Sequence, residues 1–270
     1  MINIINPTTE KIFNQTKVLW DSLTKENTQL DPFDSDFLKT FPLHEIADTT
    51  HSTIAIYNYH EFIPEYITEN VQEILGFSKE DYLSQGSKLL FSFLHPHHID
   101  FPLITSKQIE FVFKSLEPNK SNNILATCCG PMFNHPQKGT IRLLIQQYFV
   151  LPENNQIPLR AISTIQDVSH FMKGDSYFFR IIFGDKYQNI FIYHSNIDYD
   201  NKASFQKDIF SNREMEIFQL IVQGKNTDEI AEILSISRNT VNNHRQNLLD
   251  RMGVKDTTSL IELARICHII

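Results

Sequence analysis

The chain of 270 residues is poor in the residues that catalytic and cofactor-binding motifs require. Its eight glycines form no phosphate-binding loop, and no G-x-S-x-G elbow for a nucleophilic serine occurs. Three cysteines are too few for a disulfide framework. The sequence contains neither a signal peptide nor a run of 18 apolar residues. We therefore predict a cytoplasmic protein that is not an enzyme and does not bind a membrane.

The net charge excludes a broadly basic surface, because 24 basic residues stand against 32 acidic ones. The segment from Ile236 to Lys255 is different. It carries Arg238, Arg245, Arg251 and Lys255 but only one acidic residue, Asp250. Attraction to anionic groups would be concentrated on this segment, so we expect any affinity for a polyanion to be weak and to depend on dimerisation and on low salt.

Residues 211–270 predict four short helices. Ser211 with Glu214, and Asn226 with Glu229, have the spacing of capping boxes before apolar runs of helical period. Ser237 is a natural N-cap for a third helix after a two-residue turn, and Gly253 suits its C-terminus. So short a turn forces a sharp crossing, which indicates a helix-turn-helix at about 226–245.

The third predicted helix has a polar face made almost entirely of amides. At about 100° per residue, Leu248 centres the buried face, and the opposite face carries Asn239, Asn242, Asn243 and Gln246. Amides of this kind bind base edges in DNA, although asparagine is common in this chain and also fills solvated positions.

This pattern closely resembles the LuxR-type DNA-binding domain of bacterial transcription regulators. The matching residues follow the order of the family without a gap: Ser211, Arg213, Glu214, Gly224, Glu229, Ile230, Ala231, Leu234, Ser237, Thr240, Val241, His244, Arg245, Asn247, Gly253 and Val254. The resemblance covers about 60 residues and is highly specific. It implies that the helix 237–252 enters the major groove of double-stranded DNA.

The resemblance also implies roles for single residues. Base contacts map onto Asn242, Asn243 and Gln246, and backbone or supporting contacts onto Lys225, Thr227, Arg238, Asn239, Thr240 and His244. Many relatives carry lysine in place of Asn242, and Ser-Asn-Lys in place of residues 226–228. Because asparagine pairs with adenine and lysine with guanine, we predict half-sites richer in A·T than is usual for the family.

The fourth predicted helix, about 257–270, is apolar over more than one face. In the resembling family this helix pairs two DNA-binding domains, which assigns dimerisation to Leu260, Ile261, Ala264 and Cys267. The alternative is that its free face packs on the N-terminal domain of the same chain, and both arrangements are open in different states.

Residues 51–173 predict a first hairpin, several short helices and three long strands, at 123–132, 140–151 and 159–168. This order is similar to PAS domains, which enclose a small cavity between a sheet and helices. The residues that carry the similarity are Asn70, Gly76, Phe77, Ser78, Glu80, Leu83, Gly86, His95, Pro96, Asp167 and Val168. The resemblance implies a sensor domain.

No cofactor is predicted for this domain. The helix after Ser78 lacks the cysteine of flavin-reacting PAS domains, and the long helix lacks the histidine of haem-binding ones. A metal site formed by His95, His97, His98, Cys128, Cys129 and His135 is disfavoured, because the two adjacent cysteines point to opposite strand faces. The many aromatic residues either fill a core or line a pocket for a small apolar ligand, and a protein partner is the alternative signal.

The fold class predicted is α+β: a PAS-like antiparallel sheet with helices, followed by an all-α helix-turn-helix domain. The predicted domains are a helical extension (1–50, with an amphipathic helix at 9–24), the sensor (51–173), a hairpin and linker (174–209) and the DNA-binding domain (210–270). We expect a homodimeric, signal-controlled transcription regulator that acts on the transcription machinery. The alternative is a constitutive regulator whose PAS-like domain only dimerises or binds a partner.

Overall fold

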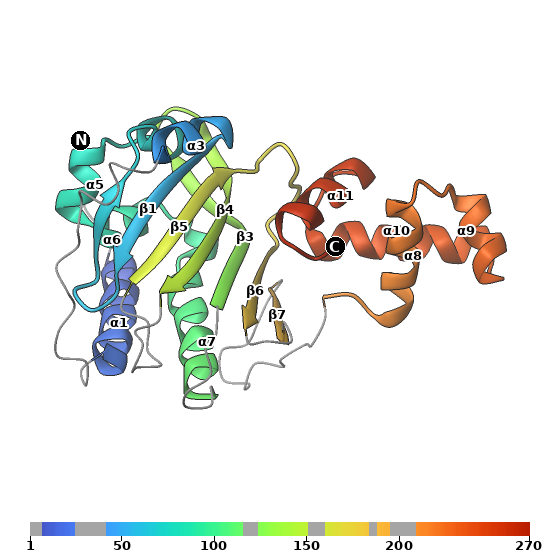
Figure 1. Cartoon of the computed structure of the whole chain (residues 1–270), viewed down its shortest axis with the longest axis horizontal. Coiled ribbons are helices and arrows are strands. Elements are labelled where there is room, and N and C mark those ends of the chain that lie inside the picture. The colour runs from blue at the N-terminus through green and yellow to red at the C-terminus, as the bar shows by residue number, and fades with distance from the viewer. Residues whose placement is uncertain (1–6, 25–41, 116–123, 151–159, 184–187, 195–208) are drawn as a thin grey trace.

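The computed structural model describes residues 7–24, 42–115, 124–150, 160–183, 188–194 and 209–270. Figure 1 shows an antiparallel sheet with helices packed against it and, to one side, a group of four helices from the C-terminal end of the chain. The fold is α+β in the predicted order. In these ranges no helix has the length and apolar character needed to cross a membrane.

The described strands form one seven-stranded antiparallel sheet of order β2-β1-β5-β4-β3-β6-β7. Their bounds are β1 Ser52–Asn58, β2 Ile63–Ile67, β3 Ile124–His135, β4 Gly139–Val150, β5 Arg160–Asp167, β6 Tyr177–Phe183 and β7 Gln188–His194. Two strands, then helices, then three strands give the predicted PAS-like arrangement. The hairpin predicted within 174–209 is formed by β6 and β7, and it extends this sheet beyond β3.

Helices α4 (Val71–Leu75), α5 (Lys79–Gln85), α6 (Ser87–Ser92) and α7 (Phe101–Ser115), with a 3-10 turn at Pro96–His98, connect β2 to β3. Ser78 caps α5 through the Asp81 amide, and Gly76 ends α4 at φ 82°. Helix α7 begins at Phe101 and has Pro102 in its first turn, where proline is tolerated. Helices α6 and α3 (Leu43–Thr49) were not predicted.

Helix α1 (Pro7–Thr24) is the predicted amphipathic helix, and it packs on α7 and the N-terminal domain's core. Its Trp20 is 1% exposed, lies 4.0 Å from the Tyr59 ring and donates a hydrogen bond to Ser106 Oγ at 3.1 Å. The sheet face that shares this core with α1 and α7 is called the inner face here, and the opposite face the outer face.

The C-terminal domain consists of α8 (Asn212–Val222), α9 (Thr227–Leu234), α10 (Arg238–Met252) and α11 (Thr257–Ile266). Both predicted capping boxes are formed, and Ser237 and Gly253 cap α10 as predicted. The predicted end of the fourth helix was wrong. Helix α11 stops at Ile266 because His268 adopts φ 55° and the Ile269 amide donates to Ala264 O.

The outer face of the sheet and the C-terminal domain share one apolar core. Cys129, Leu144 and Phe178 from the sheet belong to the same buried cluster as Phe218 and Leu248 from the C-terminal domain. Cys128 belongs instead to the inner cluster, so the two adjacent cysteines point to opposite faces as predicted. The two domains are therefore packed together through the sheet.

Candidate nucleic-acid interface and sensor cavity

The helix-turn-helix is fixed by local hydrogen bonds at each helix end. Asn226 Oδ1 accepts from the amides of Asp228 and Glu229, while Glu229 Oε2 accepts from the Asn226 amide at 2.8 Å. Ser235 ends α9 in the left-handed conformation at φ 51°, and Ser237 starts α10. This turn between two capped helices sets the angle at which α10 leaves the domain.

Helix α10 has the predicted two faces. Val241 and Leu248 are 0% exposed and Met252 is 1% exposed, which fixes the helix on the domain core. The opposite side exposes the four predicted amides, Asn239, Asn242, Asn243 and Gln246. Because this side contacts no core cluster, its amides are presented to solvent on a rigid helix.

Carboxylates hold several of the predicted DNA-contacting residues. Asp228 Oδ1 lies 2.7 Å from Arg238 Nε, and Glu229 Oε1 lies 3.8 Å from Lys225 Nζ. Asp250 Oδ1 accepts from Gln246 Nε2 at 2.8 Å. Exposed ion pairs of this kind contribute about 0–1 kcal/mol, so phosphate can replace the carboxylate at little cost.

The other predicted residues of this site lie around the same turn. Thr227 Oγ1 donates to Asn242 Oδ1 at 3.4 Å, and the Thr240 hydroxyl shares a hydrogen bond of 2.9 Å with Ser237. His244 is half-buried, with a buried Nδ1 that has no hydrogen-bond partner among the described residues. Thr227 and Thr240 are thus positioned beside the amide face, and His244 lies toward the core.

Glu214 was predicted as the capping-box partner of Ser211, but its ion pair with Arg251 was not predicted. Glu214 is 3% exposed and completes the capping box with Ser211, and Arg251 Nε lies 3.3 Å from its carboxylate. Burial alone would raise the pKa of Glu214, but the Ser211 hydrogen bonds and Arg251 outweigh it and lower the pKa. The acidic side chain therefore ties α8 to the C-terminal end of α10.

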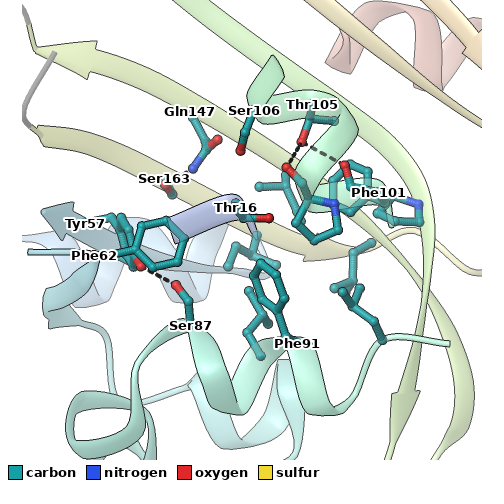
Figure 2. Close-up of a pocket in the computed structure, with 18 of the residues that line it drawn as sticks. Thr16, Tyr57, Phe62, Ser87, Phe91, Phe101, Thr105, Ser106, Gln147 and Ser163 are labelled. Atoms are coloured by element: carbon teal, nitrogen blue, oxygen red, sulfur yellow. Dashed lines mark hydrogen bonds between the residues drawn. The ribbon is translucent and has the colours of Figure 1, made fainter. Parts of the chain in front are cut away.

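The N-terminal domain encloses a cavity of about 120 Å³ between the inner face, α1, α6 and α7. Figure 2 shows aromatic rings and hydroxyl groups from these elements around it, including Tyr57, Phe62, Ser87, Phe91 and Phe101. Not one of the described residues that line it carries a charged side chain. The aromatic side chains therefore form a buried core, and some of them also line a cavity.

A few polar groups point into this cavity. Tyr57 Oη is hydrogen-bonded to Ser87 Oγ, and Gln147 Nε2 donates to Tyr59 Oη at 2.7 Å and to Ser163 Oγ at 3.3 Å. Burial raises the pKa of Tyr57 and Tyr59, so both phenols are neutral at ordinary pH. The cavity is uncharged, and its hydrogen-bonding groups already pair with one another.

The residues considered for a metal site are engaged elsewhere. His98 Nδ1 accepts from the Met132 amide at 2.8 Å, and His95 Nδ1 accepts from the His97 amide at 3.3 Å. Burial, with Arg142 nearby, lowers the pKa of His98 to about 4. Within the described ranges, no three His, Cys, Asp or Glu side chains gather as a metal ligand set would.

These features define an α+β protein with a C-terminal helix-turn-helix domain. The family model described as "Bacterial regulatory proteins, luxR family" matches residues 208–264. Spore germination protein GerE of Bacillus subtilis (strain 168) is 44% identical over 61 residues, which are 22% of this chain and 82% of GerE. The chain therefore belongs to the LuxR family of bacterial regulatory proteins through its C-terminal domain.

A longer relative is matched over a smaller share of its own length. The response regulatory protein YgeK of Escherichia coli (strain K12) is 46% identical over 54 residues, which are 20% of this chain and 37% of YgeK. Among solved structures, Vibrio cholerae VqmA, described as a LuxR-type receptor, covers 83% of this chain and 87% of its own at 15% identity, with a TM-score of 0.31. A TM-score of this size does not establish a shared overall structure.

Proposed function

We propose that this protein is a transcription regulator that binds double-stranded DNA as a homodimer through α10, under the control of a small molecule in its N-terminal cavity. The observation that carries the proposal is the exposed amide face of α10, held by a capped turn in a LuxR-type domain. A helix in this position of a helix-turn-helix enters the major groove with its N-terminal part against the bases.

The amide face supports base recognition. Asn242, Asn243 and Gln246 are exposed side chains that can each form two hydrogen bonds to adenine N6 and N7. Phosphate contacts would come from side chains that surround this face, Lys225, Thr227, Arg238 and Thr240, with Asn239 and His244 in support. The proposed half-site is therefore rich in A·T.

Dimerisation supplies the affinity that one domain lacks. Pairing through α11, by Leu260, Ile261, Ala264 and Cys267, would place two copies of α10 on half-sites about 34–36 Å apart. The bound dimer would then act on the transcription machinery.

The size and the lining of the cavity favour a compact neutral ligand. A protein cavity of about 150 Å³ lined by apolar side chains binds benzene, so 120 Å³ suits a molecule of similar size without rearrangement. Charged molecules are disfavoured because no lining side chain in the described part of the chain would compensate their desolvation. Hydroxyl or carbonyl groups on the ligand would pair with Gln147, Ser163 and Ser87.

Selection from random duplexes with the full chain tests DNA recognition. We expect palindromic sites with A·T-rich half-sites. Enrichment of no sequence over the starting pool would refute sequence-specific binding, and G·C-rich half-sites would refute the roles of the amides.

Native mass spectrometry of the purified chain tests control by a ligand. We expect a retained small molecule, whose removal changes the affinity for the selected duplex. A ligand-free dimer with full and unresponsive DNA binding would support instead a constitutive regulator whose N-terminal domain only dimerises or binds a partner.

A further inference from the structure

The aromatic rings that line the cavity of the N-terminal domain are themselves buried. Each is between 1% and 7% exposed: Trp20, Tyr57, Tyr59, Phe62, Phe91 and Phe101. A molecule of the size of benzene cannot pass between rings that are packed in this way. A ligand therefore reaches the cavity only when one of its walls moves, and the contacts that hold each wall decide which one does.

The wall formed by the sheet is held by backbone hydrogen bonds on both sides of each strand. Strand β1 lies between β2 and β5, β5 lies between β1 and β4, and β4 lies between β5 and β3. An opening in this wall would break a whole row of hydrogen bonds. The sheet is therefore the fixed part of the cavity.

The wall formed by α6 and α7 is attached to β3 by the segment that connects the two helices. The Asn134 amide donates to Phe93 O at 2.6 Å, and the His95 amide donates to Met132 O at 3.1 Å. In addition, His98 Nδ1 accepts from the Met132 amide at 2.8 Å. These hydrogen bonds lie at the end of α6 and just before α7, so they fix both helices to the sheet.

Helix α1 is held in a different way. It lies beside α7 (Figure 1), and its Thr16 and Trp20 line the cavity (Figure 2). Among the described residues, no backbone hydrogen bond joins α1 to a strand of the sheet. The buried hydroxyls of Thr16 and Thr24 donate to Ile12 O and Trp20 O, within α1 itself, at 2.9 Å each. These hydroxyls would keep their partners if the helix moved away from the domain.

Side chains hold α1 on the domain, and most of them are apolar. Phe13 contacts the Phe62 and Phe91 rings edge-on, with centroids 5.7 and 5.5 Å apart. The carboxylate of Glu10 lies 3.9 Å from Lys88 Nζ, and both side chains are exposed, so this ion pair adds little. Contacts of this kind can separate without breaking the hydrogen bonds of either surface. Helix α1 is therefore the wall that moves most easily.

Trp20 connects α1 both to α7 and to the polar groups of the cavity. Its Nε1 donates to Ser106 Oγ on α7 at 3.1 Å, and its ring lies 4.0 Å from the Tyr59 ring. Tyr59 Oη in turn accepts from Gln147 Nε2 at 2.7 Å. A molecule in the cavity that binds Gln147 would thus lie close to the residue that holds α1 in place.

We propose that α1 is a lid on the cavity, which separates from α6 and α7 as a unit to admit a small molecule and is held closed by Trp20. A molecule that fills the closed cavity stabilises the closed state, so occupancy and lid position are coupled. This inference deepens the proposed function and rests on it for the presence of a ligand. Opening of the lid, however, is a property of the ligand-free chain.

Hydrogen exchange of the full chain, followed by mass spectrometry, tests the opening. A segment that opens locally exchanges its amides faster than the rest of the fold. We expect the amides of residues 11–24 to exchange about tenfold faster or more than those of α7 and β4. Ser106→Ala removes the acceptor of Trp20 Nε1. It should accelerate exchange across α1 by about a further tenfold, as the loss of one buried hydrogen bond predicts, and leave β4 unchanged.

Ser52→Ala is the matched control. Ser52 is also a buried serine, but its hydroxyl pairs with the Thr50 hydroxyl at 2.7 Å, outside the cavity. This variant should leave the exchange of α1 as it is in the wild type. Phe13→Leu is an independent second variant, because it removes both aromatic contacts of Phe13 and leaves Ser106 in place. It should accelerate exchange across α1 as Ser106→Ala does.

Benzene is the probe for entry, because an apolar protein cavity of similar size binds it. Trp20 is the single tryptophan of the chain, so the change in tryptophan fluorescence after rapid mixing follows entry. If benzene enters under the lid, its association rate is proportional to the open fraction. Ser106→Ala should then bind benzene about tenfold faster, and Ser52→Ala at the wild-type rate. Bound benzene should also slow the exchange of α1 in the wild type.

Three results would count against this scheme in different ways. Exchange of α1 at the same rate as α7 would overturn the lid. Equal association rates in the wild type and in Ser106→Ala would overturn entry under α1. If α1 opens as expected but benzene neither binds nor slows its exchange, the opening of α1 stands and the proposed control by a compact apolar molecule fails.

Discussion

Asn242 lies on the exposed face of α10, and its amide is the sharpest test of base recognition. Asn242→Ala should lose discrimination at one A·T pair of the half-site by about 1–3 kcal/mol, because both hydrogen bonds to adenine disappear. Competition between the selected duplex and singly substituted duplexes measures this loss of discrimination. The control Gln219→Ala removes an exposed amide from α8 and should change nothing. A uniform loss of affinity across all duplexes would place Asn242 on the phosphate backbone.

Glu214 is a residue whose charge should stabilise the C-terminal domain. Its pKa is lowered in the folded state, so the stabilisation is present above the pKa of the unfolded chain, near 4.3, and disappears as the pH falls through the folded value. Glu214→Gln keeps an acceptor for Ser211 but loses the charge that faces Arg251. We expect about 1–3 kcal/mol lower unfolding free energy at pH 7, and a smaller difference toward pH 3.

Urea titrations followed by far-UV circular dichroism measure this effect across pH. Glu216→Gln is the matched control, because Glu216 pairs with Arg213 on the exposed side of the same helix and should contribute about 0–1 kcal/mol. If Glu214→Gln and Glu216→Gln lower the unfolding free energy at pH 7 by the same amount, burial of Glu214 does not increase its contribution to stability.

Among elements, those with local end signals were predictable from the sequence. Ser211, Asn226 and Ser237 begin α8, α9 and α10 because each side chain bonds an amide two or three residues ahead, within a short stretch of chain. The end of α11 was not predictable in this way. The carbonyl of Cys267, the first residue after the helix, accepts from Arg180, which lies 87 residues earlier, and a contact of that range leaves no local pattern.

The cavity, like the end of α11, depends on long-range contacts and could not be predicted from the sequence. The aromatic content of the N-terminal domain fits a filled core and an open pocket equally well, because both require large apolar side chains. What decides is the packing of α1 on α7 and the sheet, which no single segment specifies. The inward hydroxyls of Tyr57 and Ser87 were missed for this reason, since they meet across 30 residues of sequence.

Strand β4 carries the polar group that should set ligand affinity. Gln147→Leu keeps the volume but removes the amide that reaches Tyr59 and Ser163. We expect the retained ligand to bind about tenfold more weakly, as the loss of one hydrogen bond predicts, while the domain stays folded. Native mass spectrometry measures the occupancy. Gln166→Leu makes the same change on β5 at a side chain that reaches Thr50 O outside the cavity, and it should leave occupancy unchanged. Equal occupancy in both variants would exclude Gln147 from ligand contact.

For the whole molecule, a net charge of −8 makes DNA affinity depend on a few local cations and on how many domains bind at once. If Lys225 and Arg238 each neutralise one phosphate, log affinity against log salt should have a slope of about −2 for one domain and about −4 for a pair. The wild-type chain should therefore show the shallow slope on a duplex with a single half-site and the steep slope on the selected palindrome. Fluorescence anisotropy on the two duplexes over a salt series measures both. Identical slopes would mean that the same number of domains binds to each duplex, and that the acidic chain reaches its sites without pairing.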